Sequence, residues 1–134
     1  MKHRIPQGDA ERKAAPMYRA LAGYFPAALF EVAAHSLDSD RKHNPGGSPD
    51  GPTWSRGKSA DHEDCLIRHV IDAGPRRDNK LFQMAAAPKD STAKDARRYH
   101  LRSLAWRALA LLQEDCELDG AEPGVSSVFP EPLS

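Results

Sequence analysis

Apolar residues recur at helical spacing along most of this chain, and the alternation that is typical of strands is nearly absent. The clearest stripe has neighbours separated by three or four residues and consists of Leu101, Leu104, Ala105, Ala108, Leu111 and Leu112. It follows Thr92-Ala93-Lys94-Asp95, which matches a capping box with Asp in place of Glu. We therefore predict that the longest helix begins there, ends near Asp119-Gly120 and turns this stripe toward the core.

Shorter helices are predicted in front of it. Residues 9–24 carry a stripe of Ala14, Met17, Leu21 and Tyr24, and Pro26 suits the first turn of a second helix that ends near Ser39. A third helix is expected over residues 61–72, because Ser59 can cap its start and Gly74-Pro75 stops it. A fourth, short helix is expected over residues 80–87. The expected fold class is all-α, a single domain (1–134) built as a bundle of four to five helices.

Two segments are predicted to lack helical structure. Residues 40–58 are dense in Pro and Gly, and a loop of this length in a small domain is commonly either a ligand-binding segment or a disordered insertion. We interpret it as a substrate loop, with the surface insertion as the alternative. Residues 120–134 are expected to form an extended tail that can lie on a neighbouring subunit.

Composition excludes several classes of protein. Among the 134 residues, 19 basic side chains balance 19 acidic ones, so no global positive field attracts nucleic acid. No run of 18 apolar residues indicates a membrane span, and no apolar N-terminal run resembles a signal peptide. Two cysteines, Cys65 and Cys116, are too few for a disulfide framework. We expect a cytoplasmic protein with reduced thiols that binds neither nucleic acid nor membrane.

Acidic and histidine side chains interrupt the apolar helices. Glu31 and His35 are i, i+4 neighbours, and Asp64 and Arg68 have the same spacing, so solvated pairs are one explanation. The alternative is a metal site, because a buried carboxylate needs a cation. Oxygen ligands from several helices suit Mg²⁺ or Mn²⁺. The candidate metal ligands are Glu31, Asp61, Asp64 and Asp95, although Asp95 in a first turn fits a capping role equally well.

A metal of this kind commonly works with phosphates, and the chain offers groups that recognise nucleotides. Cationic side chains suit the phosphates, and an aromatic ring suits a base. The candidate nucleotide-binding residues are Lys42, Asn44, Trp54, Arg56, Arg68 and His69.

The order and spacing of several short motifs resemble a known family. They are residues 28–33, a loop with a basic pair and Asn44, Trp54-Ser55-Arg56-Gly57, the run Asp64-Cys65-Leu66-Ile67-Arg68-His69, and residues 95–112. Together they resemble phage-encoded dATP/dGTP diphosphohydrolases, which are MazG-like (in this case MazZ-like) members of the all-α nucleoside triphosphate pyrophosphohydrolases. The resemblance covers roughly residues 21–113.

The resemblance implies a helical homodimer or homotetramer that uses Mg²⁺ or Mn²⁺ to cleave a nucleoside triphosphate between its α and β phosphates. It implies a purine deoxynucleotide as substrate, dGTP first and dATP second, with a role in phage 2-aminoadenine nucleotide synthesis as one use. The compartment would then be the host cytoplasm.

The family's metal signature is Glu-x-x-Glu on one helix and Glu-x-x-Asp on the next. Here the first becomes Glu31-x-x-Ala34 and the best counterpart of the second is Asp61-x-x-Asp64, so one carboxylate is missing. The resemblance implies catalytic roles for Glu31 and Asp64, with Asp95 or His35 supplying the lost ligand. His35 and His100 are expected to hold the ligands in position.

Two other interpretations remain open at this point. The incomplete motif is compatible with a catalytically inactive relative that binds nucleotides. The helices are also compatible with a protein-interaction module whose carboxylates are solvated or ion-paired.

Overall fold

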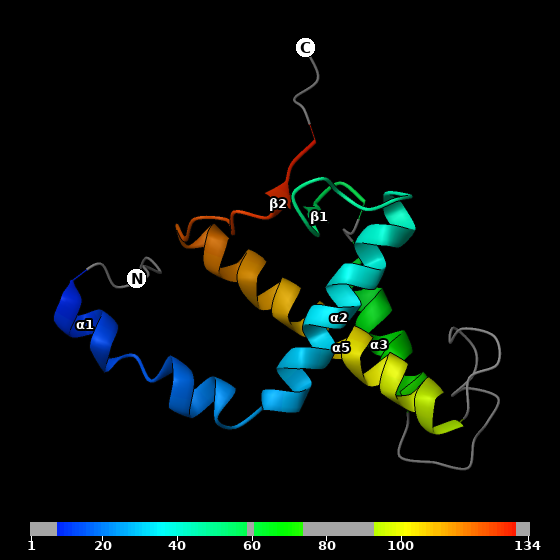
Figure 1. Ribbon diagram of the computed structural model, residues 1–134, viewed down its shortest axis with the longest axis horizontal. Coiled ribbons are helices and arrows are strands. Elements are labelled where there is room, and N and C mark those ends of the chain that lie inside the picture. The colour runs from blue at the N-terminus through cyan, green and yellow to red at the C-terminus, as the bar shows by residue number, and fades with distance from the viewer. Residues whose placement is uncertain (1–7, 59–60, 74–92, 131–134) are drawn as a thin grey trace.

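The computed structural model describes residues 8–58, 61–73 and 93–130, and its fold class is all-α, as the sequence predicts. Three helices form the body: α2 (Pro26–His43), α3 (His62–Ala73) and α5 (Ala93–Leu118). The long helix α5 packs against α3, and α2 crosses α5 (Figure 1). The predicted fourth helix over residues 80–87 lies outside the described residues.

The N-terminal segment differs from the single helix that was predicted over residues 9–24. It consists of α1 (Asp9–Ala14) and a π-helical turn, η1 (Tyr18–Ala22), which extend away from the body (Figure 1). Pro16 separates them, because proline lacks an N–H and pushes the preceding residue out of the helical region. Ala15 is indeed extended. The predicted stripe is not buried, since Met17 is 66% and Tyr24 71% exposed.

Helix α2 begins with Pro26 in its first turn, as predicted, but continues to His43, about one turn beyond the predicted end near Ser39. Its last turn carries Arg41, Lys42 and His43. Cationic side chains stabilise the negative end of a helix dipole, so this polar turn favours the helix rather than ending it.

The loop after α2 is ordered around one carboxylate. Asp40, 3% exposed, accepts hydrogen bonds from the backbone N–H groups of Ser48 (3.0 Å) and Thr53 (3.2 Å). It also accepts bonds from the Ser48 hydroxyl (2.7 Å) and the Asn44 amide (3.0 Å). The first part of the predicted 40–58 loop is therefore helical, and the rest is fastened to the end of α2.

The tail pairs with its own chain in the structure. Strand β1 (Trp54–Ser55) runs parallel to β2 (Ser127–Val128), with Trp54 opposite Ser127. The Arg56 guanidinium fixes this pair to α5 through two hydrogen bonds to Glu117, of 3.0 and 2.7 Å. Part of the predicted tail thus contacts its own chain, and the expectation that it can lie on a neighbouring subunit stays a prediction.

The described core is made of small and polar side chains. The buried residues of α3 and α5 include Cys65, His69, Ala96, His100, Ser103 and Ala110. The stripe that was predicted to face the core is only partly covered, because Leu101 is 38% and Leu112 60% exposed, whereas Leu104 and Leu111 are half-buried. Helix α5 thus has two apolar faces. The face with Ala96, His100 and Ala110 packs on α3, and the other carries Leu101 and Leu112.

No helix among the described residues is both long and apolar enough to cross a membrane.

Candidate functional site

Two histidines and an aspartate meet between α3 and α5. Helix α3 presents His69 and Asp72 on one face, because residues three apart are neighbours on a helix, and α5 presents His100. The two Nδ1 atoms of the histidines lie 2.9 Å apart, and His100 Nδ1 lies 3.9 Å from Asp72 Oδ2. All three side chains are buried, with His100 at 0% exposure. We call this group the triad.

The triad fits a divalent metal ion. Its ligand atoms all lie within 4.8 Å of one another, and it is the one group of three or more His, Cys, Asp or Glu with such spacing among the described residues. Metal–nitrogen distances of about 2.1 Å with ligands at right angles put two nitrogens roughly 3 Å apart. The observed 2.9 Å separation of the His69 and His100 nitrogens matches this value. Two imidazoles with one carboxylate suit Mn²⁺, Fe²⁺ or Zn²⁺.

The protonation of His69 favours the same role. Burial, together with the neighbouring His100 and Arg68, lowers the pKa of His69 from 6.5 to about 4. At neutral pH the ring is therefore uncharged, which is the form that binds a metal. In the hydrogen bond between the two Nδ1 atoms one ring donates and the other accepts.

His69 also lines a cleft of about 160 Å³, which we call the small cleft. Three cations line it, namely Lys42, Arg102 and Arg107, together with one carboxylate, Asp38, which accepts a hydrogen bond from Arg102 (2.6 Å). Two buried polar atoms of the lining residues have no hydrogen-bond partner in the described chain. They are the hydroxyl oxygen of Ser103, a residue that is 2% exposed, and Nε of Arg102. Buried polar groups are normally satisfied, so these atoms point to a polar ligand. Positive charge and free donors together favour an anion such as phosphate.

Arg107 stands where the small cleft meets a larger one. Its Nη1 donates to His62 Nδ1 (2.9 Å), so the other ring nitrogen of His62 carries the proton and donates to Glu114 (3.1 Å). His62 is 1% exposed and packs edge-on against Trp54. Arg107 is thereby held in one orientation.

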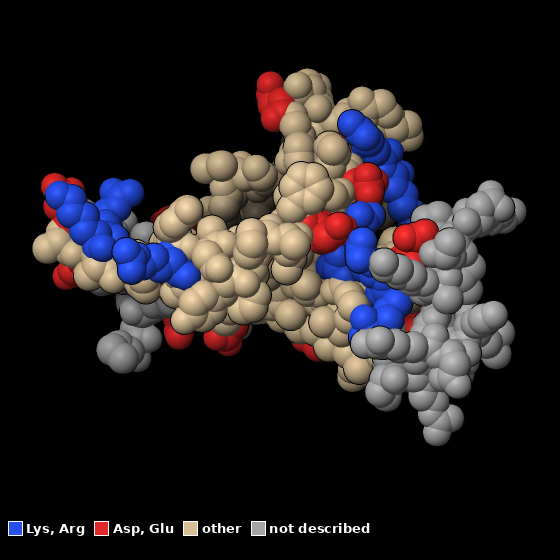
Figure 2. Space-filling view, turned by 60° about the horizontal axis from the view of Figure 1, so that its bottom comes forward, with Lys and Arg blue, Asp and Glu red and all other residues tan. Residues whose placement is uncertain are grey.

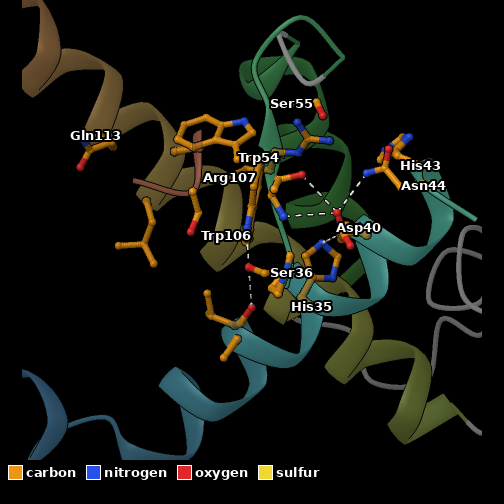
Figure 3. A pocket seen from close by; sticks show the side chains of 18 residues that line it. His35, Ser36, Asp40, His43, Asn44, Trp54, Ser55, Trp106, Arg107 and Gln113 are labelled. Atoms are coloured by element: carbon orange, nitrogen blue, oxygen red, sulfur yellow. Dashed lines mark hydrogen bonds between the residues drawn. The ribbon is translucent and has the colours of Figure 1, made fainter. Parts of the chain in front are cut away.

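The second space is a cavity of about 540 Å³, the large cavity, bounded by α2, the loop before β1 and α5 (Figure 3). His35, Ser39, His43 and Arg107 line both spaces. Trp54 and Trp106 meet in its wall with ring centroids 5.4 Å apart. Cavities of 300–1,000 Å³ with aromatic walls and a few polar groups are typical of small-molecule sites.

The structure does not bring the predicted carboxylates together. Glu31 Oε2 lies 3.6 Å from Arg102 Nη1, and Asp61 Oδ1 lies 3.9 Å from Arg107 Nη1. Asp64 and Asp95 are exposed. None of these four belongs to a group of metal-binding geometry among the described residues. The described residues thus give these four carboxylates no common metal-binding group, and two of the four lie near arginines, so their role as metal ligands stays a prediction.

The predicted nucleotide-binding residues divide into two sets. Lys42 and His69 line the small cleft, and Asn44 and Trp54 line the large cavity. Arg56 and Arg68 line neither. Arg56 lies over the Trp54 ring at 3.5 Å and holds Glu117, and Arg68 donates to Cys65 Sγ (3.1 Å). Arg56 thus has a structural role.

Sequence reasoning missed Asp72 and two of the arginines of α5, Arg102 and Arg107. His69-x-x-Asp72 is an i, i+3 pair of metal-binding residue types, which was a usable signal. His35, predicted to hold ligands in position, instead lines both cavities, and His100, predicted for the same role, belongs to the triad.

Comparisons with protein-family models, with curated proteins and with solved structures found no match to this chain.

Proposed function

We propose that this protein is a metal-dependent hydrolase that cleaves a nucleoside triphosphate between its α and β phosphates, giving a monophosphate and pyrophosphate. One observation carries the proposal. The triad borders a basic cleft through His69, and that cleft shares the lining residues His35 and Arg107 with an aromatic cavity. Metal, phosphate and base would each have a place in this arrangement.

The ligand set refines which metal we propose. Histidine nitrogens favour Mn²⁺ over Mg²⁺, whereas Mg²⁺ commonly binds through substrate phosphates. Of the two ions that the resemblance implies, we therefore infer Mn²⁺ at His69, Asp72 and His100, with Mg²⁺ able to accompany the triphosphate. Bound there, the ion would neutralise phosphoryl charge and lower the pKa of an attacking water.

The basic residues of the small cleft would stabilise the leaving group. Pyrophosphate carries more negative charge as the α–β bond breaks, and Lys42, Arg102 and Arg107 line the space beside His69. The Ser103 hydroxyl offers an additional hydrogen bond to a phosphate oxygen. Figure 2 shows Lys and Arg side chains gathered in a band on one part of the surface, apart from a second basic group on the N-terminal segment.

The aromatic cavity is the proposed place for the nucleoside. A volume of about 540 Å³ accommodates a base and sugar, and Trp54 or Trp106 offers a surface for base stacking. The choice of a purine deoxynucleotide, dGTP before dATP, rests on the family resemblance, as does a role in phage 2-aminoadenine synthesis.

The experiment is a turnover assay of the full-length protein with each dNTP and Mn²⁺ or Mg²⁺, reading out pyrophosphate and the monophosphate. We expect Asp72→Asn to lower the rate at least about 100-fold, because a ligand and its charge are lost. Glu63→Gln, at an exposed acidic position of the same helix, is the matched control. Asp64→Asn tests the catalytic carboxylate that the sequence favoured, and we expect it to retain activity.

Each negative outcome has a distinct meaning. Metal-dependent nucleotide binding without turnover would identify an inactive relative and contradict the proposed reaction. The absence of both nucleotide binding and turnover would contradict the proposal and support a protein-interaction module. Loss of activity in Asp64→Asn but not in Asp72→Asn would show that the catalytic metal does not bind at the triad.

A further inference from the structure

The N-terminal segment of residues 9–25, which we call the arm, exposes nearly all of its large apolar side chains. Figure 1 shows its two short helices, α1 and η1, extending from the start of α2 and away from α3. The exposed side chains are Met17 (66%), Tyr18 (81%), Leu21 (38%), Tyr24 (71%) and Phe25 (52%). Soluble proteins rarely leave contiguous apolar surface of this kind in water, and such surface commonly marks a docking site.

The apolar surface of the arm continues onto the first turns of α2. Phe30 is 74% exposed, and Ala27 and Ala28 are exposed beside it. At the junction, Tyr24 and Phe25 pack edge to face with ring centroids 5.9 Å apart. These two rings therefore contact each other while both remain open to solvent.

Positive charge accompanies this surface. Residues 12–30 contain three cations, Arg12, Lys13 and Arg19, and no Asp or Glu, although the whole chain has 19 side chains of each sign. All three cations are exposed, and none forms an ion pair with a carboxylate of the described residues. Figure 2 shows the Lys and Arg side chains of the N-terminal segment next to uncharged surface on one face. The arm thus combines unneutralised positive charge with exposed apolar and aromatic groups.

This combination fits the surface of an anionic lipid bilayer. Acidic headgroups attract Lys and Arg side chains that lie near the membrane surface. Apolar side chains of an amphipathic segment enter the boundary between headgroups and acyl chains. Tyrosine is enriched at that depth, because its ring is apolar and its hydroxyl is polar.

A single-stranded nucleic acid fits the arm less well. Such strands bind along a basic groove in which successive bases stack on aromatic side chains. The aliphatic Met17 and Leu21 offer no stacking surface, and Tyr24 and Phe25 are packed against each other. A lipid surface accommodates aliphatic and aromatic side chains alike.

We propose that the arm, together with the first turns of α2, binds peripherally to anionic membrane surfaces. The sequence lacks a membrane-spanning run, but surface binding requires only a short amphipathic segment, so we revise the expectation that the chain does not bind membranes. This binding does not depend on the proposed function, because the arm lines neither the small cleft nor the large cavity.

The direct test is flotation of the full-length protein with large unilamellar vesicles. We expect binding to vesicles of phosphatidylcholine with about 30% phosphatidylglycerol, and at least about tenfold weaker binding to pure phosphatidylcholine. Raising the salt concentration from about 0.1 to about 1 M should weaken binding to the anionic vesicles, because salt screens exposed charges. Equal binding to both kinds of vesicle, or binding to neither, would overturn the proposal.

A pair of triple variants tests the charge of the arm. The arm variant is Arg12→Gln, Lys13→Gln and Arg19→Gln, and its partition coefficient for the anionic vesicles should fall at least about tenfold. The control removes three exposed cations from the body, namely Arg41→Gln, Lys58→Gln and Arg98→Gln. Because both triple variants lose the same charge, binding by the control should stay within about threefold of the wild type. Equal loss in both variants would contradict a role of the arm.

A second pair of variants tests insertion of the apolar side chains. Tyr18→Ser with Tyr24→Ser should keep the helical circular dichroism spectrum and lower partitioning into the anionic vesicles at least about tenfold. Leu118→Ser with Val125→Ser, at positions that are 87% or more exposed, is the control and should bind like the wild type. Two results would assign the surface to another partner and contradict the proposal. One is binding of a single-stranded oligonucleotide that the arm variant abolishes, and the other is self-association in ultracentrifugation that the tyrosine variant abolishes.

Discussion

Histidine is the residue type on which this site depends. His62 and His100 are almost fully enclosed, and both are fixed by hydrogen bonds or charged neighbours. Neutral imidazole carries one donor and one acceptor, so a buried histidine restricts the identity of both of its partners. For His62 those partners are Arg107 and Glu114, which explains how a flexible arginine is held at the junction of two cavities.

His35 leads to a prediction about acid stability. Its burial, followed by the charge of Arg102, lowers the pKa from 6.5 to about 4. Between these values the unfolded chain binds a proton that the folded chain does not, so stability falls as the pH is lowered from 6.5 toward 4. We expect His35→Gln to reduce this slope in melting temperatures measured at pH 7.5, 6.5, 5.5 and 4.5.

His43→Gln, at an exposed position of the same helix, is the control for that experiment. An acid slope in His35→Gln that equals the slope of the wild type would show that His35 does not contribute.

At the level of elements, the sequence predicted the helices that periodicity and start signals define together. Pro26 set the start of α2, and the segment after Thr92 became the longest helix. Prediction was wrong where one signal opposed another. Pro16 divided an apolar stripe that periodicity alone had joined, and α5 turned its alanine-rich face rather than its leucines toward α3. The choice between two apolar faces depends on the partner helix, which a single helix does not encode.

The loop after α2 depends on Asp40. Hydrogen bonds from Ser48, and then from Thr53 and Asn44, hold the pKa of Asp40 well below its usual range. The carboxylate is therefore ionised through the neutral range, and the stability that it contributes is lost as the pH falls toward its folded pKa. Asp40→Ala should lower the melting temperature and expose residues 44–53 to proteolysis.

Asp50→Ala is the matched change, because Asp50 is an exposed aspartate of the same loop. Equal proteolysis of the two variants would show that the Asp40 contacts do not fasten the loop.

Arg56 fastens the two strands to α5. It makes two hydrogen bonds to Glu117, and these bonds, together with one from Gln113, lower the pKa of Glu117. Lysine keeps the charge but cannot form this two-pronged contact. We expect Arg56→Lys to lower the free energy of unfolding by about 2 kcal/mol in urea titrations.

The same variant separates structure from substrate binding. Since Arg56 lines neither cavity, KM for a triphosphate should remain within about twofold of the wild type in Arg56→Lys. A large rise in KM for the triphosphate, with an unchanged free energy of unfolding, would show that Arg56 contributes to nucleotide binding.

At the scale of the whole molecule, the sequence predicted the all-α class, but it did not predict that His69, Asp72 and His100 form a group whose spacing could hold a metal ion. His69 and His100 were singled out for other roles, and Asp72 was passed over at the end of a helix. They meet only because α3 packs on α5, and the packing angle of two helices is not readable from either one alone. Glu31 and Asp64 had stronger sequence signals, yet the folded chain separates them from the triad.

His69, Asp72 and His100 are the proposed ligands of one divalent metal ion. The most direct measurement is a titration of the full-length protein with Mn²⁺, in which electron paramagnetic resonance reports the free ion. We predict one bound Mn²⁺ per chain in the wild type and in the double variant Glu31→Gln, Asp64→Asn. In Asp72→Asn we predict an affinity that is at least about tenfold lower. Unchanged binding in Asp72→Asn, or its loss in the Glu31 and Asp64 double variant alone, would contradict the claim.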